Sequence, residues 1–140
     1  MREATEEILE EITPEFDVKN FMHHLGVELV SNDTGVCEMR LQYQDTLSVA
    51  EGVFHVGVIG AIGDIAVSAA AKSAARGDGK LELAEKKLNI FAPAKGDHLI
   101  AKAKVIKSGR TLTVVEANIY VLNGSTCSQC AMALVTLISE

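Results

Sequence analysis

Almost every residue between positions 57 and 71 is small and apolar. Only Asp64 and Ser68 are polar in that stretch, and the helical pattern continues to a Gly-Asp-Gly turn at 77–79. A helix that is apolar nearly all round has to be buried. The stretch looks too short and too interrupted for a membrane span, which needs about 20 apolar residues. We therefore predict one long helix in the interior of the fold.

Segments that alternate apolar and polar side chains lie on both sides of this helix. Residues 26–30 and 36–43 predict a hairpin, because Asn32-Asp33-Thr34-Gly35 between them is a turn signal. Further strands are expected at residues 88–91, 99–107, 111–122 and 125–138, with turns at Ser108-Gly109-Arg110 and Asn123-Gly124. This order predicts an α+β domain in which a curled antiparallel sheet of five or six strands wraps round one central helix.

The first residues differ from the rest of the chain in charge. Residues 1–17 contain seven acidic residues and one basic residue, which accounts for the whole net charge of −6. Their apolar residues recur at helical spacing, and Thr13-Pro14 is typical of the start of a short helix that ends near Gly26. Since 140 residues make one domain of ordinary size, we expect a single domain over residues 1–140, with residues 1–20 as an acidic helical extension.

Composition limits the classes of function. The chain is 48% hydrophobic and 23% charged, which suits a folded domain. The acidic start is unlike a secretory signal, and three cysteines do not make a disulfide framework, so we expect a cytoplasmic protein with no membrane partner. Residues 72–110 carry ten basic and four acidic residues. In an acidic chain this argues against a nucleic-acid partner, and indicates either attraction for a phosphorylated small molecule or an ordinary mixed surface.

Asp64 is the strongest candidate for chemistry. Its neighbours in the helix are apolar, and burial of an ionised carboxylate among them is costly unless partners or function compensate. We expect a functional carboxylate in an apolar cleft, with a cap on a neighbouring loop as the alternative. Ser68 lies one turn further on the same face, where its hydroxyl could orient Asp64 or a water, or could bond to its own helix.

The residues before the helix indicate an anion site. Residues 52–57, GVFHVG, lead into the helix, so the first amides, near Val56 and Gly57, lack intrahelical partners and can bind an anion or oxyanion. Gly57 also lets a substrate approach the backbone closely. Asp64 lies about 10–12 Å further along the helix axis. Both groups can therefore act on one reacting carbon only if a second subunit completes the site.

Two segments resemble the hot-dog-fold acyl-CoA thioesterases of the PaaI/4-hydroxybenzoyl-CoA thioesterase type: residues 52–66, GVFHVGVIGAIGDIA, and residues 88–97, LNIFAPAKGD. With the long final hairpin, the likeness extends over residues 21–138. In that family the catalytic carboxylate follows nine residues after the histidine of a Gly-x-x-His-Gly-Gly element, which is the spacing from His55 to Asp64. The resemblance implies a thioesterase that forms a homodimer, often paired into a dimer of dimers, with active sites at the dimer interface.

The resemblance assigns roles to individual residues. Asp64 corresponds to the carboxylate that acts as nucleophile or as general base on water. His55 corresponds to the histidine of the family's element, and the amide of Val56, before Gly57, corresponds to the oxyanion donor. Ser68 corresponds to a hydroxyl that some members use near the water.

Two positions depart from the family's pattern. Val49 stands where the family usually has Asn or Gln beside the thioester carbonyl, and Val56 replaces the first glycine after the histidine. These changes keep a second hypothesis open, in which the chain binds acyl-CoA without cleaving it. A third hypothesis is a 3-hydroxyacyl thioester dehydratase with His55 and Asp64 as acid and base, although the proline-glycine context of those enzymes is missing.

The reaction that the resemblance implies is hydrolysis of an acyl-CoA thioester to the free acid and coenzyme A. Coenzyme A is then part of the substrate, and no separate cofactor is expected. The apolar residues Phe54 and Phe91 suggest an acyl pocket or simply core. Four basic residues are candidates for contacts with the phosphates of coenzyme A: Arg76, Lys86, Lys87 and Lys95.

No metal site is expected. Cys127 and Cys130 are three residues apart in a predicted strand, so their thiols point to opposite faces of the sheet. His23, His24 and His98 have no cysteine partners at ligand spacing, and we expect them at the surface.

Overall fold

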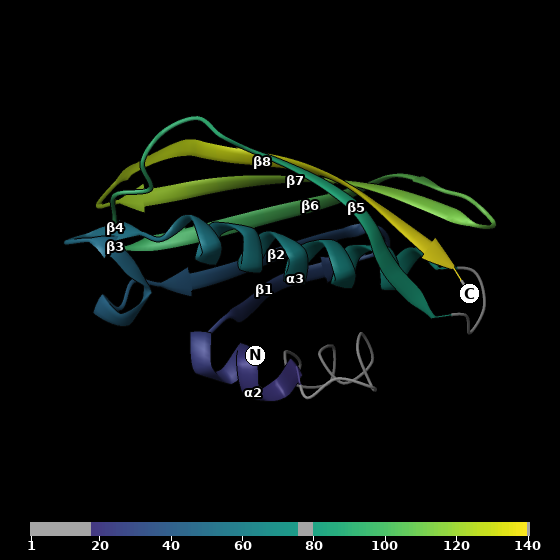
Figure 1. The fold of residues 1–140 in the computed structure, drawn as a ribbon, viewed down its shortest axis with the longest axis horizontal. Coiled ribbons are helices and arrows are strands. Elements are labelled where there is room, and N and C mark those ends of the chain that lie inside the picture. The colour runs from purple at the N-terminus through teal and green to yellow at the C-terminus, as the bar shows by residue number, and fades with distance from the viewer. Residues whose placement is uncertain (1–17, 76–79, 140) are drawn as a thin grey trace.

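A computed structural model describes residues 18–75 and 80–139. The elements in chain order are α2 (Val18–Leu25), β1 (Glu28–Asp33), β2 (Val36–Gln42), the 3-10 helix η1 (Asp45–Leu47), β3 (Ser48–Ala50), β4 (Val53–Phe54), α3 (Val56–Ala74), β5 (Leu81–Ile90), β6 (His98–Ser108), β7 (Leu112–Asn123) and β8 (Thr126–Ser139) (Figure 1). The expected acidic extension, apart from the first residues of α2, and Arg76 lie outside the described residues.

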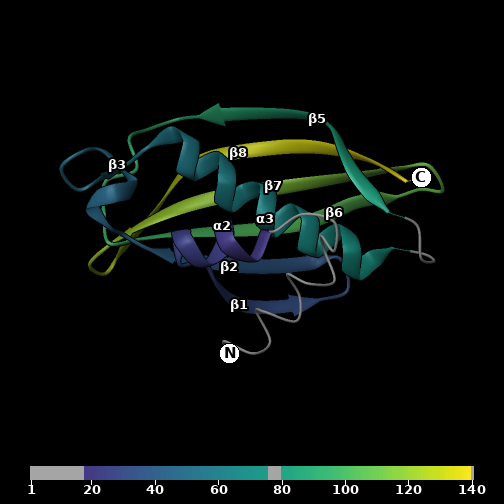
Figure 2. The same ribbon diagram turned by 60° about the horizontal axis from the view of Figure 1, so that its bottom comes forward.

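Six strands form one antiparallel sheet in the order β1-β2-β6-β7-β8-β5, and β3 pairs with β4 in a separate two-stranded sheet. The large sheet is curved, and α3 lies along its concave face (Figures 1 and 2). The predicted α+β architecture is therefore confirmed, with six strands in the sheet that curls round the helix. The edges of this sheet are β1 and β5.

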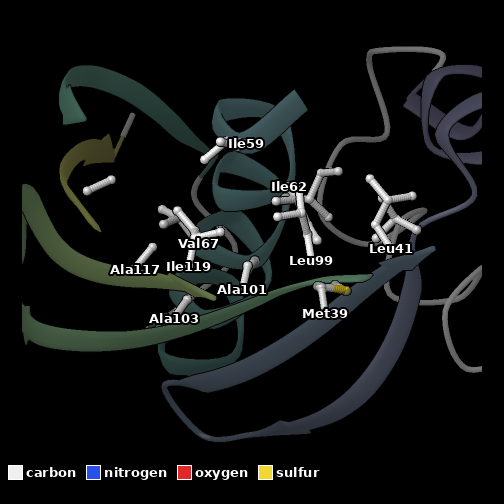
Figure 3. Close-up of a cluster of buried hydrophobic side chains, with 14 of the residues drawn as sticks. Met39, Leu41, Ile59, Ile62, Val67, Leu99, Ala101, Ala103, Ala117 and Ile119 are labelled. Carbon is white, nitrogen blue, oxygen red and sulfur yellow. The ribbon is translucent and has the colours of Figure 1, made fainter. Parts of the chain in front are cut away.

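The inner face of the sheet and α3 share one hydrophobic core (Figure 3). Residues of β7 alternate between buried and partly exposed, as expected for a strand with one face against a helix. The core includes Met39, Leu41, Ile59, Ile62, Val67, Leu99, Ala101, Ala103, Ala117 and Ile119. Full burial of one leucine-sized side chain stabilises a fold by about 1.5–3 kcal/mol, so these contacts fix the helix on the sheet.

By length and composition α3 is the one helix in residues 18–75 and 80–139 that could cross a membrane. It has 19 residues, and the mean hydropathy of its best window is 1.4, so the expectation that the stretch is too short and too interrupted for a span is wrong by this criterion. The same window is 56% buried inside the structure. The core that α3 forms with the sheet accounts for its apolar composition.

β5 begins seven residues earlier than the strand that the sequence predicts. The sequence pattern predicts a strand at 88–91, whereas β5 runs from Leu81 to Ile90 and includes the charged residues between them. β5 is hydrogen-bonded only to β8 within the described chain, and most of its side chains are exposed. An edge strand with little burial has no need for alternating apolar residues, so the sequence of its first seven residues does not indicate a strand.

The residues between β2 and α3 contain elements that the sequence analysis did not anticipate. η1 and the pair β3-β4 occupy residues 45–54, and a β-bulge at Val49 interrupts the pairing. The strands are too short to show a period in the sequence. The turns of the longer hairpins are confirmed, because Gly35 and Gly124 link their strands with φ angles of 74° and 64°, a region that favours glycine.

Gly96 is predicted to tolerate no side chain. A Cβ at this position would collide with the Leu122 carbonyl oxygen, which already accepts a hydrogen bond from the Asp97 N–H at 2.7 Å. Gly96→Ala is expected to lower the free energy of unfolding by about 1–3 kcal/mol, because backbone must move. Urea denaturation measures the change.

Gly60→Ala is the matched control. A Cβ there would lie 3.5 Å from Leu88 Cδ2, an ordinary contact, and alanine is favoured over glycine inside a helix by about 1 kcal/mol. This variant is expected to be at least as stable as the parent. A loss of stability equal to that of Gly96→Ala would contradict the packing described for both glycines.

The three cysteines are predicted to differ in reactivity. Burial raises the pKa of the Cys37 thiol to about 12 and that of the Cys130 thiol to about 11, whereas Cys127 is exposed. At pH 8 both buried thiols stay protonated and inaccessible. Titration with a disulfide reagent should detect one fast thiol per native chain and three in denaturant, and Cys127→Ser should remove the fast one. More than one fast native thiol would contradict the buried placement.

Candidate active site

α3 begins at Val56, as the sequence predicts, and His55 is its N-cap residue. The ring Nδ1 of His55 accepts a hydrogen bond from the Gly57 N–H at 2.9 Å. A ring nitrogen that accepts carries no proton, so the proton of the neutral ring lies on Nε2. A Cβ on residue 57 would lie only 3.1 Å from Nδ1. The structure therefore shows a role for Gly57 that the sequence did not indicate: it leaves room for the capping ring.

One amide in the first turn of α3 has no protein partner. The Gly57 N–H is taken by the His55 ring, and the N–H groups of Val58 and Ile59 donate to the His55 carbonyl at 3.0 and 3.3 Å. The Val56 N–H donates to no group in the described part of the chain. Because a helix N-terminus carries partial positive charge, this amide suits an anion or a developing oxyanion. The predicted anion site therefore has one hydrogen-bond donor, the Val56 N–H.

Backbone hydrogen bonds hold this end of α3 from two directions. The His55 N–H donates to the Leu47 carbonyl of η1 at 2.8 Å. The Phe54 N–H donates to the Ala94 carbonyl, in the loop between β5 and β6, at 2.9 Å. The first bond joins residues eight positions apart and the second joins residues 40 positions apart, and together they fix the position of the free amide.

Asp64 lies on the side of α3 that faces β5. Its side chain is 37% exposed, and its Oδ2 lies 3.0 Å from the Nζ of Lys86. The expectation of a carboxylate buried in an apolar cleft is wrong for the single chain, because the edge strand leaves this side of the helix partly open. The alternative of a loop cap is also excluded within the described residues, since Asp64 accepts no backbone hydrogen bond there.

Lys86 is a site residue that no sequence pattern connects with Asp64. In β5 it lies opposite Val135, and Leu88 lies opposite Ala133; both partners are buried on the inner face of the sheet. Residues two apart in a strand share a face. Had the strand been predicted to start at its true position, Lys86 would have been placed on the face toward the helix.

Ser68 is half-buried, one turn after Asp64 on α3. No hydrogen bond joins its hydroxyl to Asp64 or to any other group within residues 18–75 and 80–139. Ser68 therefore lies near the Asp64 carboxylate because the two residues are one helical turn apart, and no hydrogen bond joins them.

The apolar candidates divide into exposed and buried residues. Val49 in β3 is 63% exposed, and Phe91, just after β5, is 56% exposed. Phe54 is buried and packs edge-on against Tyr43, with ring centroids 5.3 Å apart, so in this chain it belongs to the core. Val56 is also half exposed, which leaves its side chain at the open end of the helix.

The basic candidates lie in different places. Lys86 contacts Asp64, whereas Lys87 lies opposite Leu134 on the outer face of the sheet, away from α3. Lys95 is exposed in the loop after β5 and forms a backbone bridge with Val53. The structure does not bring these lysines together.

The described residues contain no group of three His, Cys, Asp or Glu side chains that could hold a metal ion. Cys127 is exposed and Cys130 is buried, so the two thiols lie in different environments. His98 is half-buried and accepts a hydrogen bond from Arg40 at 3.1 Å; partial burial, followed by the charge of Arg40, lowers its pKa.

The family model of the thioesterase superfamily matches residues 51–128. This span includes the His55 cap, the whole of α3 and the strands β5, β6 and β7. The chain therefore belongs to the thioesterase superfamily, and thioester hydrolysis is its general class of reaction. The resemblance to hot-dog-fold thioesterases drawn from residues 52–66 and 88–97 is confirmed.

Similar proteins support this assignment. The chain is 27% identical to a thioesterase family protein from Silicibacter pomeroyi, with a TM-score of 0.85 over 94% of this chain and 97% of that one. A phenylacetic acid degradation-related protein from Ralstonia eutropha shares the fold, with 19% identity and a TM-score of 0.76 over 94% and 98% of the two chains. A Saccharolobus solfataricus protein named "Putative esterase SSO1253" is 27% identical over 85% of this chain and 77% of its own length.

The cap on α3 can be tested by substitution. His55→Ala leaves the Gly57 N–H without its acceptor and is expected to lower the free energy of unfolding by about 1 kcal/mol. His55→Asn supplies another side-chain acceptor at the cap and should recover most of that loss. Urea denaturation of both variants measures the difference, and an equal loss in the two would argue against a capping role.

Proposed function

We propose that this chain hydrolyses acyl-CoA thioesters to the free acid and coenzyme A. One observation carries the proposal: in a chain of the thioesterase superfamily, α3 presents a free amide at Val56 and a carboxylate at Asp64. An amide at a helix N-terminus suits a thioester carbonyl oxygen that gains negative charge. A carboxylate suits the attack on the carbonyl carbon, either directly or through water.

The proposed reaction needs only these two groups and water. The thioester carbonyl oxygen accepts a hydrogen bond from the Val56 N–H. In the first route, Asp64 takes a proton from water as the water oxygen adds to the carbonyl carbon; the C–S bond then breaks, and the leaving thiolate of coenzyme A takes up that proton. In the second route, Asp64 attacks the carbonyl carbon and the C–S bond breaks to give an acyl-aspartyl anhydride and the thiolate, and water then hydrolyses the anhydride. A thiolate is a good leaving group, so no strong general acid is required.

The proposed site requires a second copy of the chain. Val56 and Asp64 are eight residues apart on α3, which separates them by about 12 Å along the axis. One carbonyl group cannot contact both, so the Val56 amide would act with Asp64 of the partner subunit. A homodimer through β5 is supported by its unpaired edge in the described chain and by the exposure of Leu83 and Ile90. The exposed apolar residues of the outer face would suit a pairing of dimers: Leu112, Leu134 and Ile138.

A binding module that leaves the thioester intact is the second candidate. The observation that favours it is the exposed valine at position 49, where the resemblance calls for an amide beside the carbonyl. The exposed Val56 side chain also narrows the approach to the free amide. Neither feature removes the Val56 N–H or the Asp64 carboxylate, so hydrolysis remains the function that the site supports best.

Asp64→Asn tests the proposal. Thiol release from short, medium and aromatic acyl-CoA thioesters is expected to fall by a factor of about 100 or more, because an amide neither attacks nor accepts a proton. The variant should stay folded, since an ion pair this exposed contributes at most about 1 kcal/mol to stability. Thiol release is measured with a chromogenic thiol reagent, with the protein's own fast thiol removed by Cys127→Ser.

The matched control is Asp33→Asn, at the end of the opposite edge strand β1. It makes the same chemical change on an exposed carboxylate whose main-chain carbonyl accepts a hydrogen bond from the Ser73 hydroxyl, near the C-terminal end of α3 and nine residues beyond Asp64. This variant is expected to leave kcat unchanged. Wild-type protein that releases no thiol, but whose melting temperature rises with acyl-CoA, would overturn hydrolysis and establish the binding module.

A further inference from the structure

The inner face of the large sheet presents one charge to α3. The inward residues of β1, β2, β6, β7 and β8 are apolar or uncharged, and those of β5 are Leu81, Leu83, Lys86, Leu88 and Ile90. The buried thiols Cys37 and Cys130 are neutral, because burial raises their pKa to about 12 and about 11. Within residues 18–75 and 80–139, Lys86 is therefore the single charged group of the sheet that faces the helix.

This lysine meets the carboxylate that the helix carries in its middle. Lys86 Nζ lies 3.0 Å from Asp64 Oδ2. Gly60, one turn before Asp64, makes room for the contact: a Cβ there would lie 3.5 Å from Leu88 Cδ2 and 3.8 Å from Lys86 Nζ. A side chain longer than alanine at position 60 would push the ammonium away. Strand register and helix packing thus set the position of Lys86.

The contact uses one carboxylate oxygen. Oδ2 of Asp64 accepts from Lys86, and Oδ1 has no partner in the described part of the chain. A carboxylate held by one oxygen keeps the other free for attack or for a proton from water. The side chains of Asp64 and Lys86 are 37% and 31% exposed, and a pair with that exposure adds at most about 1 kcal/mol to stability. Its main physical effect is on the orientation of the carboxylate.

We propose that Lys86 is a positioning residue, which holds the Asp64 side chain so that Oδ1 is presented to the thioester. This inference rests on the proposed thioesterase function and deepens it. The alternative use of Lys86 is contact with the phosphates of coenzyme A, through the N–H donors of the ammonium that Asp64 does not use. The two uses predict different kinetics, because positioning affects turnover and phosphate contact affects substrate binding.

The experiment compares Lys86→Met with Lys104→Met on two substrates. Lys104 is exposed on the outer face of β6, opposite Glu116, so its variant loses the same charge away from Asp64. The substrates are an acyl-CoA and the matching acyl-N-acetylcysteamine thioester, which has no phosphates. Lys86→Met is expected to lower kcat by about 10- to 100-fold on both substrates with little change in KM, a typical effect of a misplaced reacting group. Lys104→Met should leave kcat unchanged, and Lys86→Arg should recover part of the lost rate.

A double-mutant cycle completes the test. If Lys86 acts through Asp64, Lys86→Met should cause no further loss in an Asp64→Asn background. The proposal is overturned if Lys86→Met leaves kcat unchanged, raises KM for acyl-CoA alone, or lowers the residual rate of Asp64→Asn. Failure of the proposed function is a separate result, because wild-type protein would then release no thiol from either substrate. That result would overturn both proposals.

Discussion

The packing of α3 into the concave face of the sheet is the interaction on which the rest of the structure depends. The helix can approach the strands closely because its contact residues are small: a Cβ at Gly63 would lie 3.3 Å from Ile119 Cδ1, and Ala66 and Ala70 are fully buried. Close packing excludes water and fixes the helix axis. Once the axis is fixed, the N-terminus with Val56 and the side that carries Asp64 are both fixed as well.

In the part of the chain that the structure describes, the charged pair of this apolar layer lies on the open side of α3. Asp64 and Lys86 meet where the edge strand β5 covers the helix only in part. A position deeper in the sheet would make an ionised carboxylate much more costly, and an exposed surface would leave it without orientation. Partial exposure together with one ion pair leaves the Asp64 carboxylate both accessible and held in place, as the proposed attack on a thioester requires.

The other half of the site follows from how the helix start is capped. His55 occupies the Gly57 amide, its carbonyl takes the next two, and Val56 keeps the only free N–H of the first turn in the described chain. A single donor is a weak oxyanion site unless it is held rigidly. Bonds from η1 and from the loop after β5 hold it, so segments distant in sequence decide the position of one amide.

Local patterns in the sequence determined the long buried helix, its start at Val56, the glycine turns of the hairpins and Asp64 as the residue of interest. Each depends on spacing within a few residues. Tertiary structure alone decided the true extent of β5, the exposure of Asp64 and its contact with Lys86, 22 positions away. An edge strand needs no apolar period, and the burial of a side chain depends on which strand lies beside it, so neither could be predicted from local patterns.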